Sequence, residues 1–349
     1  MRRLITLLKR LTGDNSQQGA STVIVAVLMV ALLGFTALVV DVGAMYAEKA
    51  QLQNGADAAA LAIAGDCARG DLCTIAAVTP TGEDMADGNA NDDSSGVASI
   101  DLSVPGTVRV ETNARDAATG ADSLSLNFAR IFGIETSDIG ASAEASWGPP
   151  SGGSAFPWTV SKCIFMQFLS SSQRAELNAT GSFTGNPSSA PVLLRYDTSP
   201  PVFPGCPPEN GYLPGGFGWL DTTGVGCSAE ISTSATVDGR PGNVYPTDAE
   251  CNGMLATLLN EPVLIPLFDQ ATANGSNTVY RVIGFAAFEI TAYKLSGGGP
   301  GMVSSPAPAG CTGDCRAIAG RFTRFVALDE MPVAPGLPNY GASVVSLTR

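Results

Sequence analysis

The sequence contains no histidine among its 349 residues. This absence removes the commonest general base, the commonest neutral metal ligand, and the Ser-His and Cys-His nucleophile pairs. The G-x-S-x-G, S-x-x-K and phosphate-loop motifs are also missing. We therefore expect a protein that is not an enzyme and binds no cofactor or metal. An anchored hydrolase that uses paired carboxylates is the enzyme class that remains as an alternative.

Charged residues are scarce, at 15% of the chain, against roughly 25% in an average soluble domain. Positive charge is the scarcer sign, and the net charge is −13. Residues 1–20 carry a balance of +3, so the rest of the chain carries −16. Phosphate groups would repel a body this acidic. We expect no nucleic-acid partner.

Residues 20–40 form an uncharged apolar run, ASTVIVAVLMVALLGFTALVV. As a helix this run is about 30 Å long, which matches the core of a bilayer. It is longer than the apolar part of a cleavable secretory signal, and the helical pattern continues past it. Basic residues precede the run and acidic residues follow it. The positive-inside rule then predicts a single-pass protein of the cell membrane, with a cytoplasmic leader (1–19), a transmembrane helix (20–40) and an extracytoplasmic body. A buried core helix is the alternative.

A helical repeat continues beyond the apolar run. Met45, Leu52 and Ala59 are seven residues apart, and Ala56 and Ile63 follow the last two by four residues. These positions form one apolar stripe. Because the stripe is narrow and rich in alanine, it would let a partner helix or sheet approach closely. We expect one helix over about residues 20–65.

The segment resembles a known family. Its marks are the polar entry at Gly19, the apolar run, VDVG at residues 40–43, Tyr46, and QLQNGADAAALA at residues 51–62. Over residues 17–65 they resemble the N-terminal signature of TadE/TadG-like proteins of the tight-adherence (Flp) pilus-assembly systems, and a looser likeness extends through residues 125–147. The resemblance implies a minor, membrane-anchored component of pilus biogenesis. Its partners would be the membrane and other pilus-assembly or pilin-like proteins.

We expect eight residues of this segment to serve helix packing or assembly: Asp41, Gly43, Tyr46, Leu52, Ala56, Asp57, Ala59 and Ile63. Asp41 has two interpretations. It either marks the membrane boundary, which we favour, or is a buried charge that recognises a partner. A second hypothesis for the whole chain is an anchored cell-surface binding module, for example for wall glycan, with no pilus role.

The sequence departs from the family at two places. Gly19 could precede a prepilin cleavage site, but Ile24 stands where such a site needs glutamate, so we expect the leader to be retained. Some family members carry an Asp-x-Ser-x-Ser metal motif. The nearest match here, DTSPP at residues 197–201, fails at its last position.

The predicted fold class is α+β. The long helix should continue into a pilin-like arrangement with a small antiparallel sheet over residues 41–147. A Gly/Pro-rich linker (148–157) and a β-rich, disulfide-bonded domain (158–349) should follow. In the first part, strands at 99–104 and 107–113 should form a hairpin, with a short helix at 122–132 and a strand at 138–147. In the second part we expect a bulge at Gly284, a helix over 248–259, and strands at 160–169, 192–196, 263–268, 279–295 and 318–328.

The sequence contains eight cysteines, and all lie beyond the apolar run: Cys67, Cys73, Cys163, Cys206, Cys227, Cys251, Cys311 and Cys315. An even number in an exported body predicts disulfides. Cys67 and Cys73 should pair locally. The other six allow fifteen pairings, of which Cys206–Cys227 is one guess, and Cys311 with Cys315 could instead belong to a zinc site.

Two further segments have alternative interpretations. Residues 83–93 (EDMADGNANDD) partly match a calcium loop, but Asp92 stands where glycine is needed, so we favour a solvated surface loop. Trp219, within GFGWLD at residues 216–221, either fills a small core, which we favour, or stacks on carbohydrate.

Overall fold

The computed structural model describes residues 16–195, 206, 217–222, 227–240, 251, 253–272, 278–295, 301–328, 331–334 and 336–348. The chain forms two compact units. The first unit comprises Met1–Ala59, Gly82–Ser99 and Val110–Ser142, and the second comprises Ala60–Thr81, Ile100–Arg109 and Ala143–Arg349. The boundary between them falls within helices α2 and α3 and strands β1, β2 and β5, so each of these elements contributes residues to both units.

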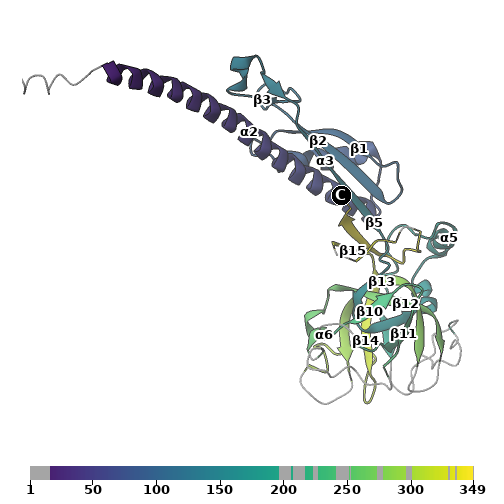
Figure 1. The fold of residues 1–349 in the computed structure, drawn as a ribbon. Helices are drawn as coiled ribbons and strands as arrows, with labels where there is room; N and C mark the ends of the chain where they lie inside the picture. The colour runs from purple at the N-terminus through teal and green to yellow at the C-terminus, as the bar shows by residue number, and fades with distance from the viewer. Residues whose placement is uncertain are drawn as a thin grey trace, which may run out of the picture. The chain divides into compact units, whose positions relative to one another are not determined.

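Helix α2 (Ser16–Arg69) is one continuous helix of 54 residues (Figure 1). It contains no proline, and its commonest residue is alanine, which has the highest helix propensity. The helix ends where Gly70 adopts a left-handed conformation (φ 88°) and donates its N–H to the carbonyl of Cys67. The prediction of a single helix that begins in the apolar run and continues to about residue 65 is confirmed.

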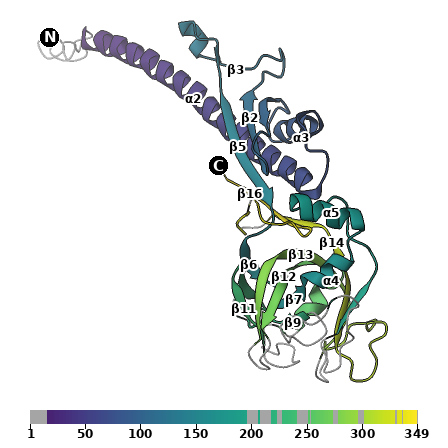
Figure 2. The same ribbon diagram turned by 90° about the vertical axis from the view of Figure 1, so that its right-hand side faces the viewer.

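A five-stranded sheet has the order β1-β2-β5-β16-β15 (Figure 2). The predicted hairpin is confirmed, because β1 and β2 are neighbours joined by a turn in which Gly106 has φ 76° and Thr107 donates to Val104. Burial alternates along β2 and β5, so each strand turns one side toward the interior. The bounds are β1 Ser95–Asp101, β2 Thr107–Ala114, β5 Gly140–Gly148, β15 Phe325–Leu328 and β16 Ala342–Leu347.

Between β2 and β5 the chain forms a small arm, which comprises the strand pair β3 (Leu124–Ser125) and β4 (Thr136–Ser137) and the 3-10 helix η1 (Ala129–Phe132). The short helix predicted over residues 122–132 is therefore present only in its last four residues. The start of that segment forms part of a strand.

Helix α3 (Ile75–Asp87) corrects the prediction of a surface loop over residues 83–93. The first five residues of that segment are helical. A Cβ atom on Gly55 of α2 would lie 3.2 Å from the Cα of Ala86, so the absence of a side chain at Gly55 permits a close approach of α3. The Asp87 carboxylate accepts the backbone N–H of Ser95 at 2.9 Å, so one of its oxygens caps the start of β1.

The second unit is built on a seven-stranded sheet of order β8-β14-β13-β12-β7-β9, with β11 also paired to β13 (Figure 2). The predicted bulge is confirmed, because the pairing of β12 with β13 skips Ile283, beside Gly284. Ring carbons of Tyr340 lie 2.9 Å from the place of a Cβ on Gly284, so only glycine fits there. The strands are β7 Trp158–Ser161, β8 Val192–Arg195, β9 Phe217–Trp219, β11 Thr236–Asp238, β12 Pro262–Thr272, β13 Val279–Lys294 and β14 Ala317–Thr323.

Aromatic rings fill the core of the second unit. Phe288 makes edge contacts with Trp158 and Phe322, at ring-centre distances of 5.2 and 5.1 Å. Trp219 is 3% exposed and contacts Phe156, which confirms it as a core residue. Edge-to-face packing of this kind adds stability beyond the buried area.

Two local predictions in this unit need correction. The strand expected over residues 160–169 ends at Ser161, because the Ser161 side chain accepts the N–H of Cys163 and starts helix α4 (Lys162–Gln167). Helix α5 (Ser171–Thr180) follows, with a capping box at Ser170. Of the helix expected over 248–259, the structure shows α6 (Met254–Thr257), and residues 241–250 and 252 lie outside the described part.

The segment at residues 148–157, expected to be a linker, contains strand β6 (Gly152–Ala155). This strand pairs antiparallel with β10 (Ala229–Ser232). The final strand β16 pairs with β5 on one side and with β15 on the other. Residues 143–148 of β5 therefore lie in one compact unit with the last strand of the chain.

All eight cysteines form disulfides. The predicted Cys67–Cys73 pair is confirmed. The guessed pairing of Cys206 with Cys227 is wrong. The bond between Cys311 and Cys315 occupies both thiols of the alternative zinc site. The distal pairs are Cys163–Cys206, Cys227–Cys251 and Cys311–Cys315.

Candidate functional site

One side of α2 is covered by the chain itself. Leu52, Ala56, Ala59 and Ile63 are each at most 1% exposed. Leu52 packs in a cluster with alanines of β2 and β5, and its carbonyl accepts the hydroxyl of Thr112 at 2.9 Å. The apolar stripe found in the sequence therefore contributes to the fold of this chain.

The other side of α2 is open. Tyr46 is 75% exposed, and nothing lies within 4 Å of the place of a Cβ on Gly43. Asp57 is half-buried and accepts an N–H of Gln53 at 2.9 Å. Of the eight expected packing or assembly residues, the structure brings Gly43 and Tyr46 together on this open side. We call the side that carries them the open face of α2.

Asp41 has a role that the sequence did not reveal. It is only 3% exposed, and its carboxylate accepts the backbone N–H groups of Asn127 (3.0 Å), Phe128 (3.0 Å) and Ala129 (2.6 Å). These donors stand at the start of η1, where a helix leaves N–H groups unpaired. Asp41 thereby fastens the arm to α2.

The surroundings of Asp41 keep its carboxylate charged. Burial acts to raise its pKa, but the three backbone donors and the positive charge of Arg130 together outweigh that effect. The net result is a pKa below the ordinary value for aspartate. Asp41 is therefore ionised at neutral pH.

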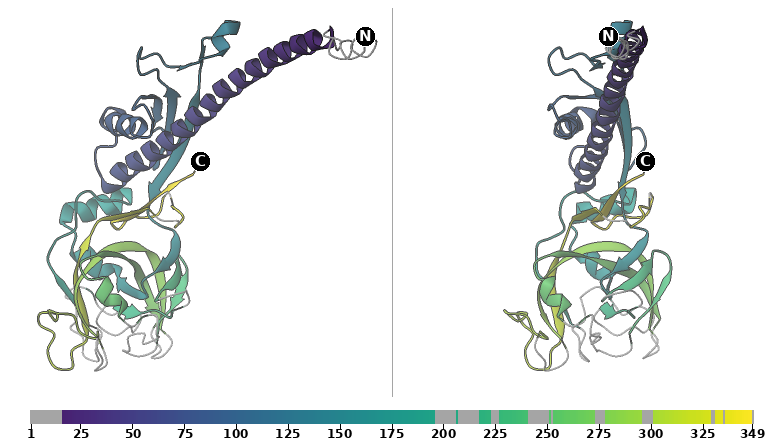
Figure 3. Two further views of the ribbon diagram at one scale, coloured as in Figure 1. Left: turned by 90° about the vertical axis from the view of Figure 1, so that its left-hand side faces the viewer. Right: turned by 60° about the vertical axis from the view of Figure 1, so that its left-hand side comes forward.

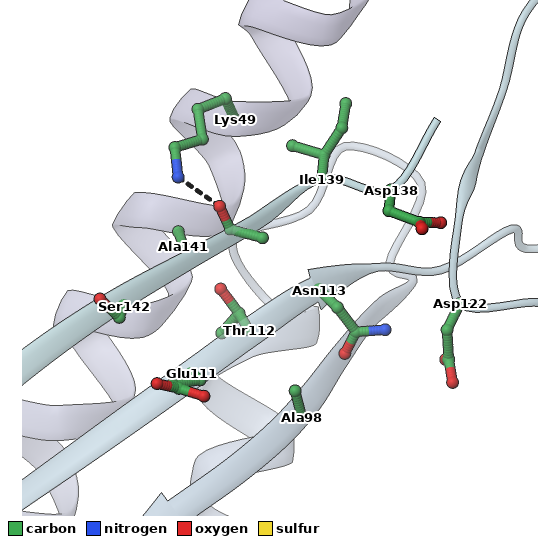
Figure 4. Close-up of a pocket in the computed structure, with 11 residues that line it drawn as sticks. Lys49, Ala98, Glu111, Thr112, Asn113, Asp122, Asp138, Ile139, Ala141 and Ser142 are labelled. Atoms are coloured by element: carbon green, nitrogen blue, oxygen red, sulfur yellow. Dashed lines mark hydrogen bonds between the residues drawn. The ribbon is translucent and has the colours of Figure 1, made fainter. Parts of the chain in front are cut away.

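Two surface hollows lie on the first unit where Lys49 of α2 meets β5. The ammonium group of Lys49 donates a hydrogen bond to the carbonyl of Gly140. One hollow, of about 440 Å³, is lined by Val42, Met45 and Tyr46 among others. The other, of about 460 Å³, is also lined by Lys49, together with residues of strands β2 and β5 (Figure 4).

The second hollow contains three carboxylates, two of which have structural partners. Glu111 accepts the hydroxyl of Ser99 at 3.0 Å, and Asp122 pairs with Arg115 at 3.6 Å. In Figure 4 these carboxylate side chains stand apart from one another. Within the described ranges, no group of three or more His, Cys, Asp or Glu side chains is placed to hold a metal ion.

Residues 21–40 of α2 are exposed, apart from Ala37, which is half-buried. Between Val23 and Val40 the large apolar side chains are 40–71% exposed, and none of the most apolar window of the helix is buried. Among the described residues, α2 is the one helix long and apolar enough to cross a membrane. Such a surface fits a lipid environment and a single-pass anchor.

Comparison with known proteins supports the same segment. No curated protein and no solved structure matches the chain. Residues 19–66 match the family described as "Putative Flp pilus-assembly TadE/G-like". The matched region covers the anchor helix with Asp41, Gly43 and Tyr46, and leaves the β-rich body outside. The resemblance inferred from the sequence is thereby confirmed over residues 19–66.

Proposed function

We propose that the chain is a membrane-anchored structural component of a Tad (Flp) type pilus or secretion apparatus. The N-terminus lies in the cytoplasm, α2 crosses the membrane, and the disulfide-bonded body lies outside. The family match over residues 19–66 and the exposed apolar half of α2 support this role. The disulfides support the orientation, because such bonds persist in oxidising compartments.

The division of α2 into two faces is the observation that carries the proposal. The apolar stripe from Leu52 to Ile63 is buried inside the chain, so it is not available to another protein. Contacts with other assembly components therefore use the open face. Gly43 allows a close approach of another helix, and Tyr46 beside it offers a large amphipathic ring.

A photo-crosslinking amino acid in place of Tyr46 tests the proposal. The full chain is produced in its own cells, and adducts are identified after irradiation of intact membranes. Leu72 is the matched control, because it is also 75% exposed but lies beyond the end of α2. We expect adducts with another pilus-assembly or pilin-like protein from position 46 and none from position 72. No adduct from position 46, or the same adducts from both positions, would contradict the proposal.

A role as a wall-glycan binding module has less support. Glycan recognition commonly uses exposed aromatic rings, but Trp158 and Trp219 are 0% and 3% exposed, and Trp147 is half-buried. A pull-down with purified cell wall distinguishes the two hypotheses. Retention of the full chain on purified cell wall, together with no crosslink at position 46, would favour the binding module.

A further inference from the structure

The arm between β2 and β5 ends in a cluster of exposed apolar side chains. Ile131 is 77% exposed, Phe132 70%, Ile134 55% and Phe128 39%. We call these four residues the apolar tip. Single exposed apolar residues are common on protein surfaces, but four within seven positions mark a contact surface.

The apolar tip lies beside the membrane boundary of α2. Asp41 is the first residue after the uncharged run, and it holds the backbone of Asn127, Phe128 and Ala129 directly. The arm that contains β3 lies beside the middle of α2 (Figures 1–3). The apolar tip therefore lies near the level at which the lipid-facing surface of α2 ends.

Backbone N–H groups of the arm are hydrogen-bonded within the protein, which matters in lipid because lipid tails offer no hydrogen-bond partners. Six N–H groups between Asn127 and Ile134 have acceptors within the protein. Asp41 accepts three of them, and carbonyls of Phe128, Arg130 and Ala129 accept those of Ile131, Gly133 and Ile134. Unpaired backbone groups are costly in lipid, so this pairing removes the main obstacle to insertion.

The positive charge of Arg130 on the arm suits the lipid headgroup region of a membrane. Arg130 is exposed and lies between apolar side chains, where its guanidinium can reach lipid phosphates while its neighbours enter the acyl boundary. Its Nε donates to the carbonyl of Asn127 at 2.9 Å, and its positive charge also acts on the carboxylate of Asp41.

We propose that the apolar tip inserts into the outer boundary of the same bilayer that α2 crosses. The chain then touches the membrane at two points, a spanning helix and an inserted turn, which Asp41 fastens together. This second contact restricts the tilt and rotation of α2, and so fixes which way the open face of α2 is presented. The inference rests on the proposed membrane-spanning role of α2.

Depth-dependent fluorescence quenching tests the inference. The full chain is reconstituted in lipid vesicles, with one introduced cysteine carrying an environment-sensitive dye and with quencher groups on the acyl chains. The test position is Ile131→Cys. Val30→Cys is the reference within the bilayer, because Val30 is 71% exposed on the apolar half of α2. Glu83→Cys on α3 is the reference in water, because α3 packs at Gly55, about 21 Å along the helix from Asp41.

We expect a blue-shifted emission and lipid quenching at positions 30 and 131, and neither at position 83. Adding Phe132→Asp to the Ile131→Cys variant should abolish the quenching at position 131 and leave position 30 unchanged. If position 30 is quenched but position 131 is not, the apolar tip does not enter the membrane and this inference is wrong, while the anchor stands. If position 30 is not quenched either, α2 does not span the membrane, and both the proposed function and this inference are wrong.

Discussion

The carboxylate of Asp41 accepts the backbone N–H of Ala129 at 2.6 Å, although the two residues are 88 positions apart in the chain. This contact joins the end of the apolar run of α2 to a turn with exposed apolar side chains. An aspartate at this point of the sequence suggests a marker of the membrane boundary. In the structure its buried carboxylate binds backbone N–H groups of the arm, and this contact determines where the arm lies on α2.

Replacement of Asp41 should release the arm without unfolding the body. In Asp41→Ala the N–H groups of Asn127, Phe128 and Ala129 lose their acceptor, so hydrogen exchange at these amides should accelerate. Asp57→Ala is the control, because Asp57 lies on the same helix and accepts from Gln53 within that helix. Unchanged exchange at residues 127–129 in Asp41→Ala would show that the carboxylate does not hold the arm.

The base of the arm should weaken only in strong acid. Hydrogen bonds from Ser125 and Thr119 lower the pKa of Asp116 to about 2. Because the folded pKa lies below the unfolded value near 3.8, the stabilisation is complete above that value and is lost as the pH falls towards 2. The protection factor of the Thr119 amide, which is the exchange rate of the unfolded chain at each pH divided by the observed rate, should fall only below about pH 4 when it is followed from pH 5 to pH 2. Asp116→Asn should abolish this pH dependence, and a transition near neutral pH would contradict the assignment.

Two glycines of α2 should respond in opposite ways to the same substitution. Gly55→Leu should destabilise the fold by about 1–3 kcal/mol, because its side chain would collide with Ala86 on α3. Gly43→Leu should leave stability unchanged or raise it by up to about 1 kcal/mol, because its surroundings are open and leucine favours a helix. Denaturation of the purified full chain measures both effects. Gly43→Leu should also reduce crosslinking from position 46, and equal stability losses at both glycines would contradict the two-face account.

The disulfides should differ in how much they contribute to the free energy of unfolding. In the chain-entropy model, the bond between Cys163 and Cys206, with a separation of 43 residues, stabilises by about 4 kcal/mol. The bond between Cys311 and Cys315, with a separation of 4, stabilises by about 2 kcal/mol. Replacement of each pair by alanine, followed by denaturant unfolding, should show the larger loss for the first pair. The reverse order would show that strain or residual structure dominates.

The sequence predicted the parts of the fold that depend on local patterns. Hydropathy and uninterrupted helix formers predicted α2, and the turn at Gly106 predicted the hairpin of β1 and β2. The short spacing of Cys67 and Cys73 predicted their pair. Gly284 was identified because a strand of that length seldom runs without a bulge.

The rest depends on contacts between distant residues. Nothing near Asp41 indicates that its partners are the amides of residues 127–129. Helix α3 was missed because it is short, acidic and contains Pro80, and its position depends on the gap left by Gly55. The apolar stripe from Leu52 to Ile63 is buried within the chain, and periodicity does not say whether the partner of such a stripe belongs to the same chain. The open face of α2 emerges only once the buried face is known.

The most direct test of the account is the thiol state of the protein in the membrane fraction. Cells are lysed in the presence of a thiol-alkylating reagent, and the membranes are washed with alkaline carbonate. The mass of the full chain is then measured by mass spectrometry without reduction of its disulfides. An anchored protein with an exported body predicts recovery in the washed membranes with none of the eight cysteines alkylated. Recovery in the soluble fraction with alkylated cysteines would contradict both the anchor and the outward orientation.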